Sequence, residues 1–146
     1  MRNPMATRKT EKRPVPPSIT DAEWKVMLAF WERGDLNLRE VVEALAAGTD
    51  WKLRTVQTLI RRLVSKGALS VEEKGRDFRY SAAFSQAECQ HDESRSFLGR
   101  VFEGRLVPFM AGMVENEEIS REEINELRQL LDEAAERQSH SLTTHE

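Results

Sequence analysis

Residues 51–67, with the sequence WKLRTVQTLIRRLVSKG, constrain the possible folds of this chain more than any other stretch. Their apolar members recur at the i, i+3, i+4 and i+7 spacing of one face of an α-helix: Val56, Leu59, Ile60, Leu63 and Val64. Asp50 is placed to cap the start of this helix, and Gly67 suits the left-handed backbone position that follows the last turn. The stretch therefore predicts an amphipathic helix with one face in a core.

The opposite face of this predicted helix carries cations and hydrogen-bond donors but no carboxylate. Its members are Lys52, Arg54, Thr55, Gln57, Thr58, Arg61 and Arg62. A solvated helix face normally mixes both signs of charge, so an acid-free face in a chain of net charge −3 indicates an anionic partner. An α-helix fits the major groove of DNA, where such side chains reach base edges and phosphates. The alternative is an ordinary core helix with a basic outer face.

The hydrophobic period changes from 3.6 to 2 after Gly67. Apolar residues then alternate with polar ones on both sides of a turn at residues 74–77: Leu69, Val71, Phe78 and Tyr80. This pattern predicts a β-hairpin, and we expect these four residues to pack on the helices because a two-stranded ribbon is marginal alone. The hairpin would present three cations to the DNA backbone as a wing: Lys74, Arg76 and Arg79.

Two capping boxes, Thr20–Glu23 and Asn37–Glu40, predict two further helices that precede the helix of residues 51–67 in the chain. Their apolar stripes are Trp24, Met27, Leu28 and Trp31 in one and Leu38, Val41, Val42 and Leu45 in the other. The two tryptophans could stack on bases, but their helical spacing favours a place in the core. Three helices followed by a basic hairpin predict a winged helix-turn-helix DNA-binding domain over residues 18–83.

Residues 84–138 predict three further helices, which begin near Ser85, Leu106 and Ser120. Their apolar residues form a dense row that we expect to be a dimerisation surface: Phe97, Leu98, Val101, Phe102, Leu106, Phe109, Met110, Met113, Val114, Ile124, Leu127, Leu130 and Leu131. About 55 residues is near the size at which a lone core becomes thin, so pairing with a second copy is the economical way to cover the row. The helix of residues 51–67 would be the recognition helix, the one that enters the major groove. A dimer would place the recognition helix of the second copy in the next major groove, ~34 Å away.

The charge of the chain is unevenly distributed. Residues 1–80 carry 16 Lys and Arg against 11 Asp and Glu, whereas residues 81–146 carry 6 against 14. Such asymmetry indicates one half that faces a polyanion and another half that does not. The basic, proline-containing residues 1–17 and the polar residues 139–146 predict disordered tails. The first tail could lie along phosphates or enter a minor groove, although a plain solubilising tail is the favoured interpretation.

Other classes of protein find little support in the residues. There is no Gly-rich phosphate loop and no nucleophile elbow, so we expect no enzyme and no cofactor. Cys89 and the three histidines lack the spacing of a four-ligand zinc site, and the carboxylates of residues 115–126 are typical of a solvated face, so we expect no metal. A single cysteine and the absence of an apolar run of roughly 20 residues predict a cytoplasmic protein without membrane insertion.

Five stretches of the chain resemble the penicillinase-repressor family, the BlaI/MecI-type bacterial repressors. They are Ile19–Met27, Trp51–Leu59, Arg62–Leu69, Ser94–Leu98 and Glu122–Leu127. The similarity spans about residues 18–135, and the second and third stretches together are the most specific. Lys52 stands where many members have Ser, a change that affects base preference or only the helix cap.

The resemblance implies a homodimeric winged-helix repressor that binds a palindromic operator of β-lactam-resistance genes or of related responses. It also implies a sensor-protease pathway, in which a membrane-bound zinc metalloprotease leads to a cut in the dimerisation domain. The family's Asn-Phe cut site aligns with Gly112-Met113, so this chain departs from the family at that possible proteolytic site. Copper-responsive relatives carry paired cysteine motifs, whereas this chain has only Cys89.

We therefore expect a mainly α-helical, sequence-specific DNA-binding repressor, with a winged helix-turn-helix domain followed by a three-helix dimerisation domain. The residues expected at bases or nearby phosphates are Arg54, Thr55, Gln57, Thr58 and Arg61. Those expected to anchor phosphates are Lys52, Arg62, Lys74, Arg76 and Arg79. The alternative is a protein-interaction adaptor that uses the winged helix as a scaffold, and a ligand-sensing regulator is a third option without a visible polar pocket.

Overall fold

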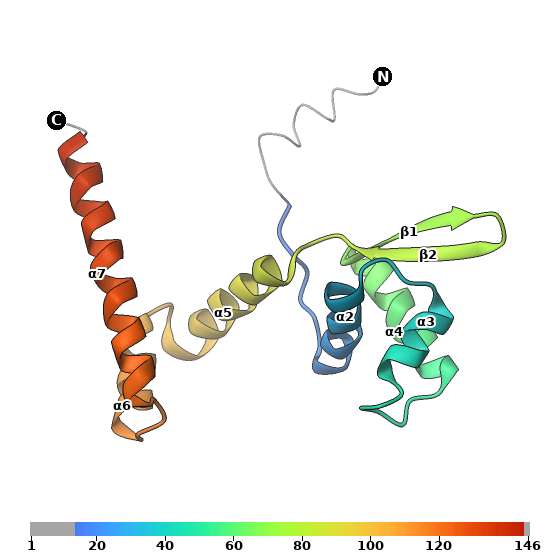
Figure 1. Ribbon diagram of the computed structural model, residues 1–146, viewed down its shortest axis with the longest axis horizontal. Coiled ribbons are helices and arrows are strands. Elements are labelled where there is room, and N and C mark those ends of the chain that lie inside the picture. Colours follow the sequence, from blue (N-terminus) through green and yellow to red (C-terminus); the bar gives the residue numbers. More distant parts are fainter. Residues whose placement is uncertain (1–13, 145–146) are drawn as a thin grey trace. The chain divides into compact units, whose positions relative to one another are not determined.

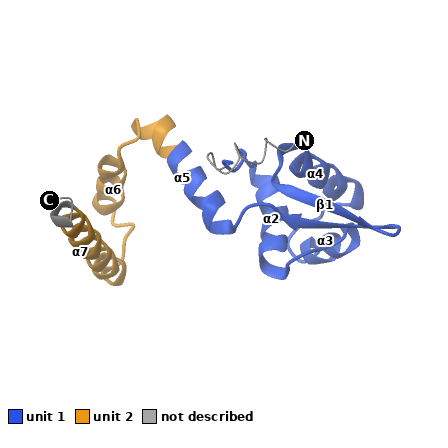
Figure 2. Cartoon of the chain, turned by 90° about the horizontal axis from the view of Figure 1, so that it is seen from above, with its two compact units in different colours: residues 1–96 blue, residues 97–146 orange. Residues whose placement is uncertain are grey.

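The computed structural model describes residues 14–144 and divides into two compact units, residues 1–96 and 97–146 (Figure 2). The boundary between the units falls within the helix Gln86–Phe102, whereas the sequence predicts a boundary between residues 83 and 84. The reason is that the first turns of this helix bury Cys89 in the core of the first unit, with 1% of the residue exposed. Residues 1–13 and 145–146, which belong to the predicted tails, lie outside the described residues.

The first unit is a winged helix, as predicted (Figure 1). Its elements are α2 (Asp21–Arg33), α3 (Leu38–Leu45), α4 (Leu53–Lys66), β1 (Leu69–Lys74), β2 (Asp77–Ala82) and the beginning of α5 (Gln86–Phe102). Both predicted capping boxes are present: Thr20 with Glu23 at the start of α2, and Asn37 with Glu40 at the start of α3. Gly67 ends α4 with a φ of 90°, a conformation that favours glycine.

The predicted cap of α4 is wrong. The helix begins at Leu53, so its N-cap is Lys52 rather than Asp50, and the Lys52 side chain makes no capping hydrogen bond. The apolar face is as predicted, since Val56, Leu59, Ile60 and Leu63 are all buried.

The core lies where α2, α3 and α4 meet beneath the hairpin. Val26, Met27 and Phe30 supply the buried apolar face of α2, whereas Leu28, expected in that stripe, is 39% exposed because it lies one position off this face. The half-buried rings of Trp24 and Trp31 meet edge to face at 5.1 Å, and both pack on the core. The Trp31 indole Nε1 donates to the Phe84 carbonyl oxygen at 2.9 Å. These tryptophans therefore support the fold and are not placed for base stacking.

The hairpin is antiparallel, with Leu69 opposite Ala82 and Val71 opposite Tyr80, and its turn has Gly75 at a φ of 65°. Leu36 pairs with Tyr80 through two backbone hydrogen bonds of 3.1 and 2.8 Å, which ties β2 to the loop before α3. Leu69 is buried and Tyr80 is half-buried, as expected. The expectation is wrong for Val71 and Phe78, which are 46% and 49% exposed, because they line an open groove between the hairpin and α4 instead of the core.

The second unit comprises the end of α5, α6 (Leu106–Glu115) and α7 (Arg121–Thr144). The rings of Phe97, Phe102 and Phe109 meet edge to face, with centroids 5.6–5.9 Å apart. α7 continues to Thr144, so residues 139–144, predicted to belong to a disordered tail, are helical. The physical reason is that the sequence after Ser120 contains no glycine or proline to end the helix.

Candidate nucleic-acid interface

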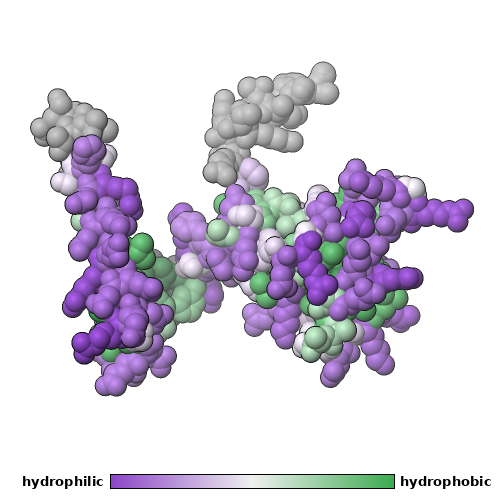
Figure 3. All heavy atoms as spheres, viewed as in Figure 1, coloured by the Kyte–Doolittle hydropathy of each residue, from purple (hydrophilic) through white to green (hydrophobic). Residues whose placement is uncertain are grey.

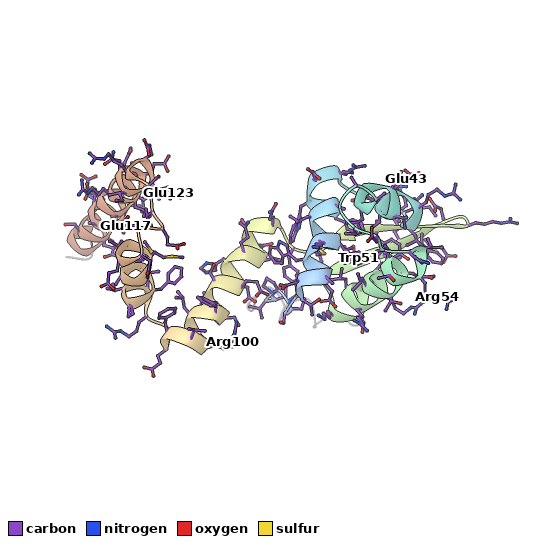
Figure 4. All side chains as sticks on the ribbon, turned by 90° about the horizontal axis from the view of Figure 1, so that it is seen from below. Glu43, Trp51, Arg54, Arg100, Glu117 and Glu123 are labelled. Carbon is purple, nitrogen blue, oxygen red and sulfur yellow. The ribbon has the colours of Figure 1, made fainter. Side chains whose placement is uncertain are left out.

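The outer face of α4 is exposed along its whole length. Arg54, Gln57 and Arg61 follow one another at helical spacing and are exposed, as are Thr55 and Arg62. Thr58 is half-buried, and its hydroxyl donates to the Arg54 carbonyl oxygen at 3.0 Å, which leaves its oxygen free to accept. Figure 4 shows Arg54 on the outside of the unit. The fold therefore brings these predicted residues together on one face, with no carboxylate in the helix.

The start of α4 adds to the positive character of this face. Its first turn contains no acidic residue, and the N-cap side chain of Lys52 leaves the first backbone N–H groups unpaired by a cap. The positive end of the helix dipole therefore lies beside the cations of Lys52 and Arg54. Trp51 precedes them and packs on the core, with Lys25 Nζ 5.8 Å from the centre of its ring.

Replacing Lys52 with serine is expected to change stability and DNA binding in opposite directions. A serine hydroxyl can cap α4, so the free energy of unfolding should rise by about 1 kcal/mol. Loss of one phosphate anchor should weaken DNA binding and reduce the slope of log K against log salt by ~0.9. Urea unfolding and a salt-titrated binding assay measure the two effects. Weaker binding with an unchanged salt slope would show that Lys52 neutralises no phosphate.

The cations of the hairpin are not equivalent. Lys74 and Arg76 are exposed at the turn, and Lys74 Nζ lies 3.9 Å from Glu72 in a solvated pair. Arg79 is only 31% exposed in its side chain: it donates to the Asp35 carbonyl oxygen at 2.9 Å and lies 3.3 Å from Glu40. The structure therefore places Lys74 and Arg76 at the tip and engages Arg79 within the unit. No short-range pattern in the sequence predicts these contacts, because Asp35 and Glu40 lie far from Arg79 along the chain.

An ion pair between the buried Glu23 and the partly exposed Lys66 supports the far end of α4. Glu23 is 1% exposed, caps α2 and accepts from Lys66 of α4, whose Nζ also donates to the Ser18 carbonyl oxygen at 2.8 Å. Burial by itself raises the pKa of the Glu23 carboxyl, but hydrogen bonds from Lys66 and Thr20 outweigh it, so the pKa lies below its usual value. The pair ties the recognition helix to the segment that precedes α2. Sequence reasoning found the capping role of Glu23 but not its partner.

The predicted dimerisation residues divide into two groups. Seven are half-buried within their own unit: Leu98, Phe102, Phe109, Met110, Met113, Ile124 and Leu127. Six remain exposed: Phe97, Val101, Leu106, Val114, Leu130 and Leu131. Val107, at 73% exposure, was absent from the prediction. None of residues 97–141 is buried, and hydrophobic residues show on the surface around α6 (Figure 3).

The possible proteolytic site lies in the last turn of α6. The Gly112 carbonyl oxygen accepts from the backbone N–H of Asn116 at 3.1 Å and from its side chain at 2.8 Å. The Met113 carbonyl oxygen accepts from the Glu118 N–H at 2.9 Å. The bond between Gly112 and Met113 is therefore held in a hydrogen-bonded helix end.

Within residues 14–144, no group of three or more His, Cys, Asp or Glu side chains is placed to hold a metal ion. Cys89 is a buried free thiol, and its burial, with a smaller effect from Glu88, Asp92 and Glu93, raises its pKa. In the same part of the chain, no helix is both long enough and apolar enough to cross a bilayer.

The arrangement defines a class of protein. Three helices, a hairpin with cations at its tip and an exposed, acid-free third helix make a winged helix-turn-helix DNA-binding protein. Residues 19–133 match the family model described as penicillinase repressor. The chain therefore belongs to the penicillinase repressor family, and it is a DNA-binding transcriptional repressor rather than an enzyme. The adaptor interpretation is accordingly not retained.

Two individual relatives agree with this assignment, and the chain is also similar to two solved structures. The chain is 38% identical to the penicillinase repressor of Bacillus licheniformis, over 80% of this chain and 91% of that protein. It is 30% identical to the methicillin resistance regulatory protein MecI of Staphylococcus aureus (strain N315), over 77% of this chain and 92% of that protein. The solution structure of the DNA-binding domain of the repressor BlaI has 36% sequence identity and a TM-score of 0.46, over 50% of this chain and 89% of that one. The solution structure of the Bacillus licheniformis BlaI monomeric form in complex with the blaP half-operator has 36% sequence identity and a TM-score of 0.45, over 50% of this chain and 89% of that one.

Proposed function

We propose that this repressor acts as a homodimer that binds a palindromic operator, with α4 of each subunit in a major groove. The observation that carries this proposal is the exposed, acid-free face of α4, whose side chains are spaced to reach base edges and phosphates. The residues proposed to contact bases or nearby phosphates are Arg54, Thr55, Gln57, Thr58 and Arg61. The phosphate anchors are Lys52, Arg62, Lys74 and Arg76, whereas the contacts of Arg79 suit a positioning role in the hairpin.

Dimerisation is supported by the second unit, which lacks a buried residue between positions 97 and 141. Its exposed apolar side chains include Val107 at 73% and Leu131 at 63% exposure, more than a short helical segment leaves to water without a partner. A second copy covers such a face with the same residues, as two-fold pairs do. The two recognition helices then lie about one duplex turn apart on a palindromic site.

The names of the relatives suggest the genes that are controlled. Since they are repressors of penicillinase and regulators of methicillin resistance, we propose operators of resistance or stress-response genes and a cytoplasmic site of action beside the chromosome. The proposal extends to release through a sensor-protease pathway. Cleavage between Gly112 and Met113 would then require the last turn of α6 to unwind, because proteolysis favours exposed, unstructured segments.

Two substitutions test the proposed DNA interface in one salt-titrated binding assay. Gln57→Ala should cost about 1–3 kcal/mol on the operator and much less on a scrambled duplex, because an amide that reads a base edge discriminates between sequences. Arg76→Ala should weaken binding to both duplexes equally and reduce the salt slope by ~0.9, because a phosphate contact carries no sequence information. Equal losses on the two duplexes in the Gln57→Ala protein would remove Gln57 from the readout set.

A further inference from the structure

A groove of about 420 Å³ separates α4 from the hairpin. Its α4 side includes Gln57, Arg61 and Val64, and its hairpin side is formed by Val71, Phe78 and Tyr80. The groove is therefore apolar along the hairpin and bordered on the helix by two side chains of the proposed DNA interface. It lies entirely within the first unit.

Two residues of the apolar wall, Val71 and Phe78, are more exposed than the packing of the hairpin requires. Val71 is 46% exposed and Phe78 is 49% exposed, although both lie on the hairpin face whose other members, Leu69 and Tyr80, pack on the core. A half-exposed aromatic ring contributes less to stability than a fully buried one, and about half of its apolar surface remains uncovered. That surface is available to whatever enters the groove.

The position of the groove identifies its occupant. Arg61 and Gln57 stand at one wall, and the hairpin tip with Lys74 and Arg76 begins a few residues beyond Phe78. If α4 lies in the major groove and the tip lies on the backbone, one sugar-phosphate strand must pass between them. We propose that Val71 and Phe78 pack against the deoxyribose rings of this strand while Arg61 pairs with one of its phosphates. This inference rests on the proposed function and adds an apolar, sequence-independent contact to it.

The charges around Phe78 favour a sugar over a phosphate at this point. Glu73 lies directly opposite Phe78 in the hairpin register, and its carboxylate repels a phosphate there. The cations flank this position instead, with Arg61 on α4 and Lys74 and Arg76 at the tip. Phosphates are thus drawn to either side, and the ring of Phe78 meets the less polar face of the sugar between them.

Binding to operator and scrambled duplexes, measured across a range of salt concentrations, tests the inference. Phe78→Ala should weaken binding to both duplexes by about tenfold at every salt concentration and leave the salt slope unchanged, because an apolar contact releases no counterion. Val71→Ser, on the other strand of the hairpin, should show a smaller loss of the same kind. Phe78→Leu should retain most of the affinity, since a bulky apolar side chain remains.

The matched control is Leu28→Ala, which removes an apolar side chain of similar exposure, 39%, from α2 outside the groove. It should bind as the unaltered protein does. Wild-type affinity in both Phe78→Ala and Val71→Ser, with Arg76→Ala behaving as proposed, would overturn this inference alone. An altered salt slope in Phe78→Ala would also contradict it, and loss of dimerisation in that variant would assign the groove to a second copy. A wild-type protein that ignores both duplexes would refute the proposed function itself.

Discussion

Replacement of Leu130 and Leu131 with aspartate is expected to convert the protein into a monomer and to lower its affinity for a full palindromic operator by ~10²- to 10⁴-fold. The two leucines are 60% and 63% exposed on α7, so the change removes little packing within the subunit. In a dimer they would be covered, and burying two unpaired carboxylates there is strongly unfavourable. Linked binding of two half-sites would be lost, because each subunit would then bind independently.

A matched control is available on the same helix. Asn125→Asp together with Gln129→Asp adds the same two negative charges to exposed positions of α7 away from the apolar stripe. This variant should remain dimeric and should bind the operator with nearly unchanged affinity. On a duplex that carries a single half-site, the Leu130/Leu131 variant should bind almost as well as the unaltered protein. A leucine variant that stays dimeric in sedimentation equilibrium would place the interface elsewhere.

Replacement of Lys66 with methionine is expected to destabilise the first unit by about 3 kcal/mol near neutral pH. Methionine keeps the apolar stem and removes the ammonium group that pairs with Glu23. Because Glu23 is 1% exposed, its carboxylate would be left buried without its main partner. Urea unfolding measures the loss. Arg39→Met, which removes an exposed cation from α3, should change the free energy of unfolding by less than about 0.5 kcal/mol.

The pH dependence of this effect has a defined sign. In the folded protein the pKa of Glu23 lies below its unfolded value, so the pair stabilises the fold at neutral pH, and this contribution is lost as the pH falls through the folded-state pKa. Loss of Lys66 removes contributions that lower the pKa of Glu23, so in the variant this pKa is expected to be higher than in the unaltered protein. The difference in stability between the two proteins should therefore shrink on acidification. A difference that is constant between pH 7 and pH 3 would show that Lys66 acts through packing alone.

Much of the first unit could be predicted because its signals are local. The apolar spacing of residues 56–63, the two capping boxes and the glycines at positions 67 and 75 each depend on neighbours within a few residues. The recognition face followed from the same periodicity. The predicted N-cap of α4, Asp50, lies two residues before the actual N-cap, Lys52. Either residue can stand at a helix start, and the conformation of the preceding turn determines which one does.

Contacts between distant residues could not be read from the sequence. Lys66 meets Glu23 across 43 positions, and Arg79 meets the Asp35 carbonyl oxygen across 44, so no short-range pattern predicts either pair. The hairpin shows the same limit. Alternation correctly puts Val71 and Phe78 on the inner face, but only the packing of the hairpin against α4 shows that they line an open groove rather than the core. In the second unit, helical spacing identifies the apolar face of each helix. It does not show whether that face packs against a helix of the same chain or of a second chain.

The most direct test of the central claim is the stoichiometry and footprint of the complex on the operator upstream of a controlled gene. The account predicts two chains per palindromic duplex and two protected major-groove segments whose centres lie ~10 base pairs, or a small multiple of that, apart. One chain per duplex with a single protected segment, or the same protection on a scrambled sequence, would contradict it.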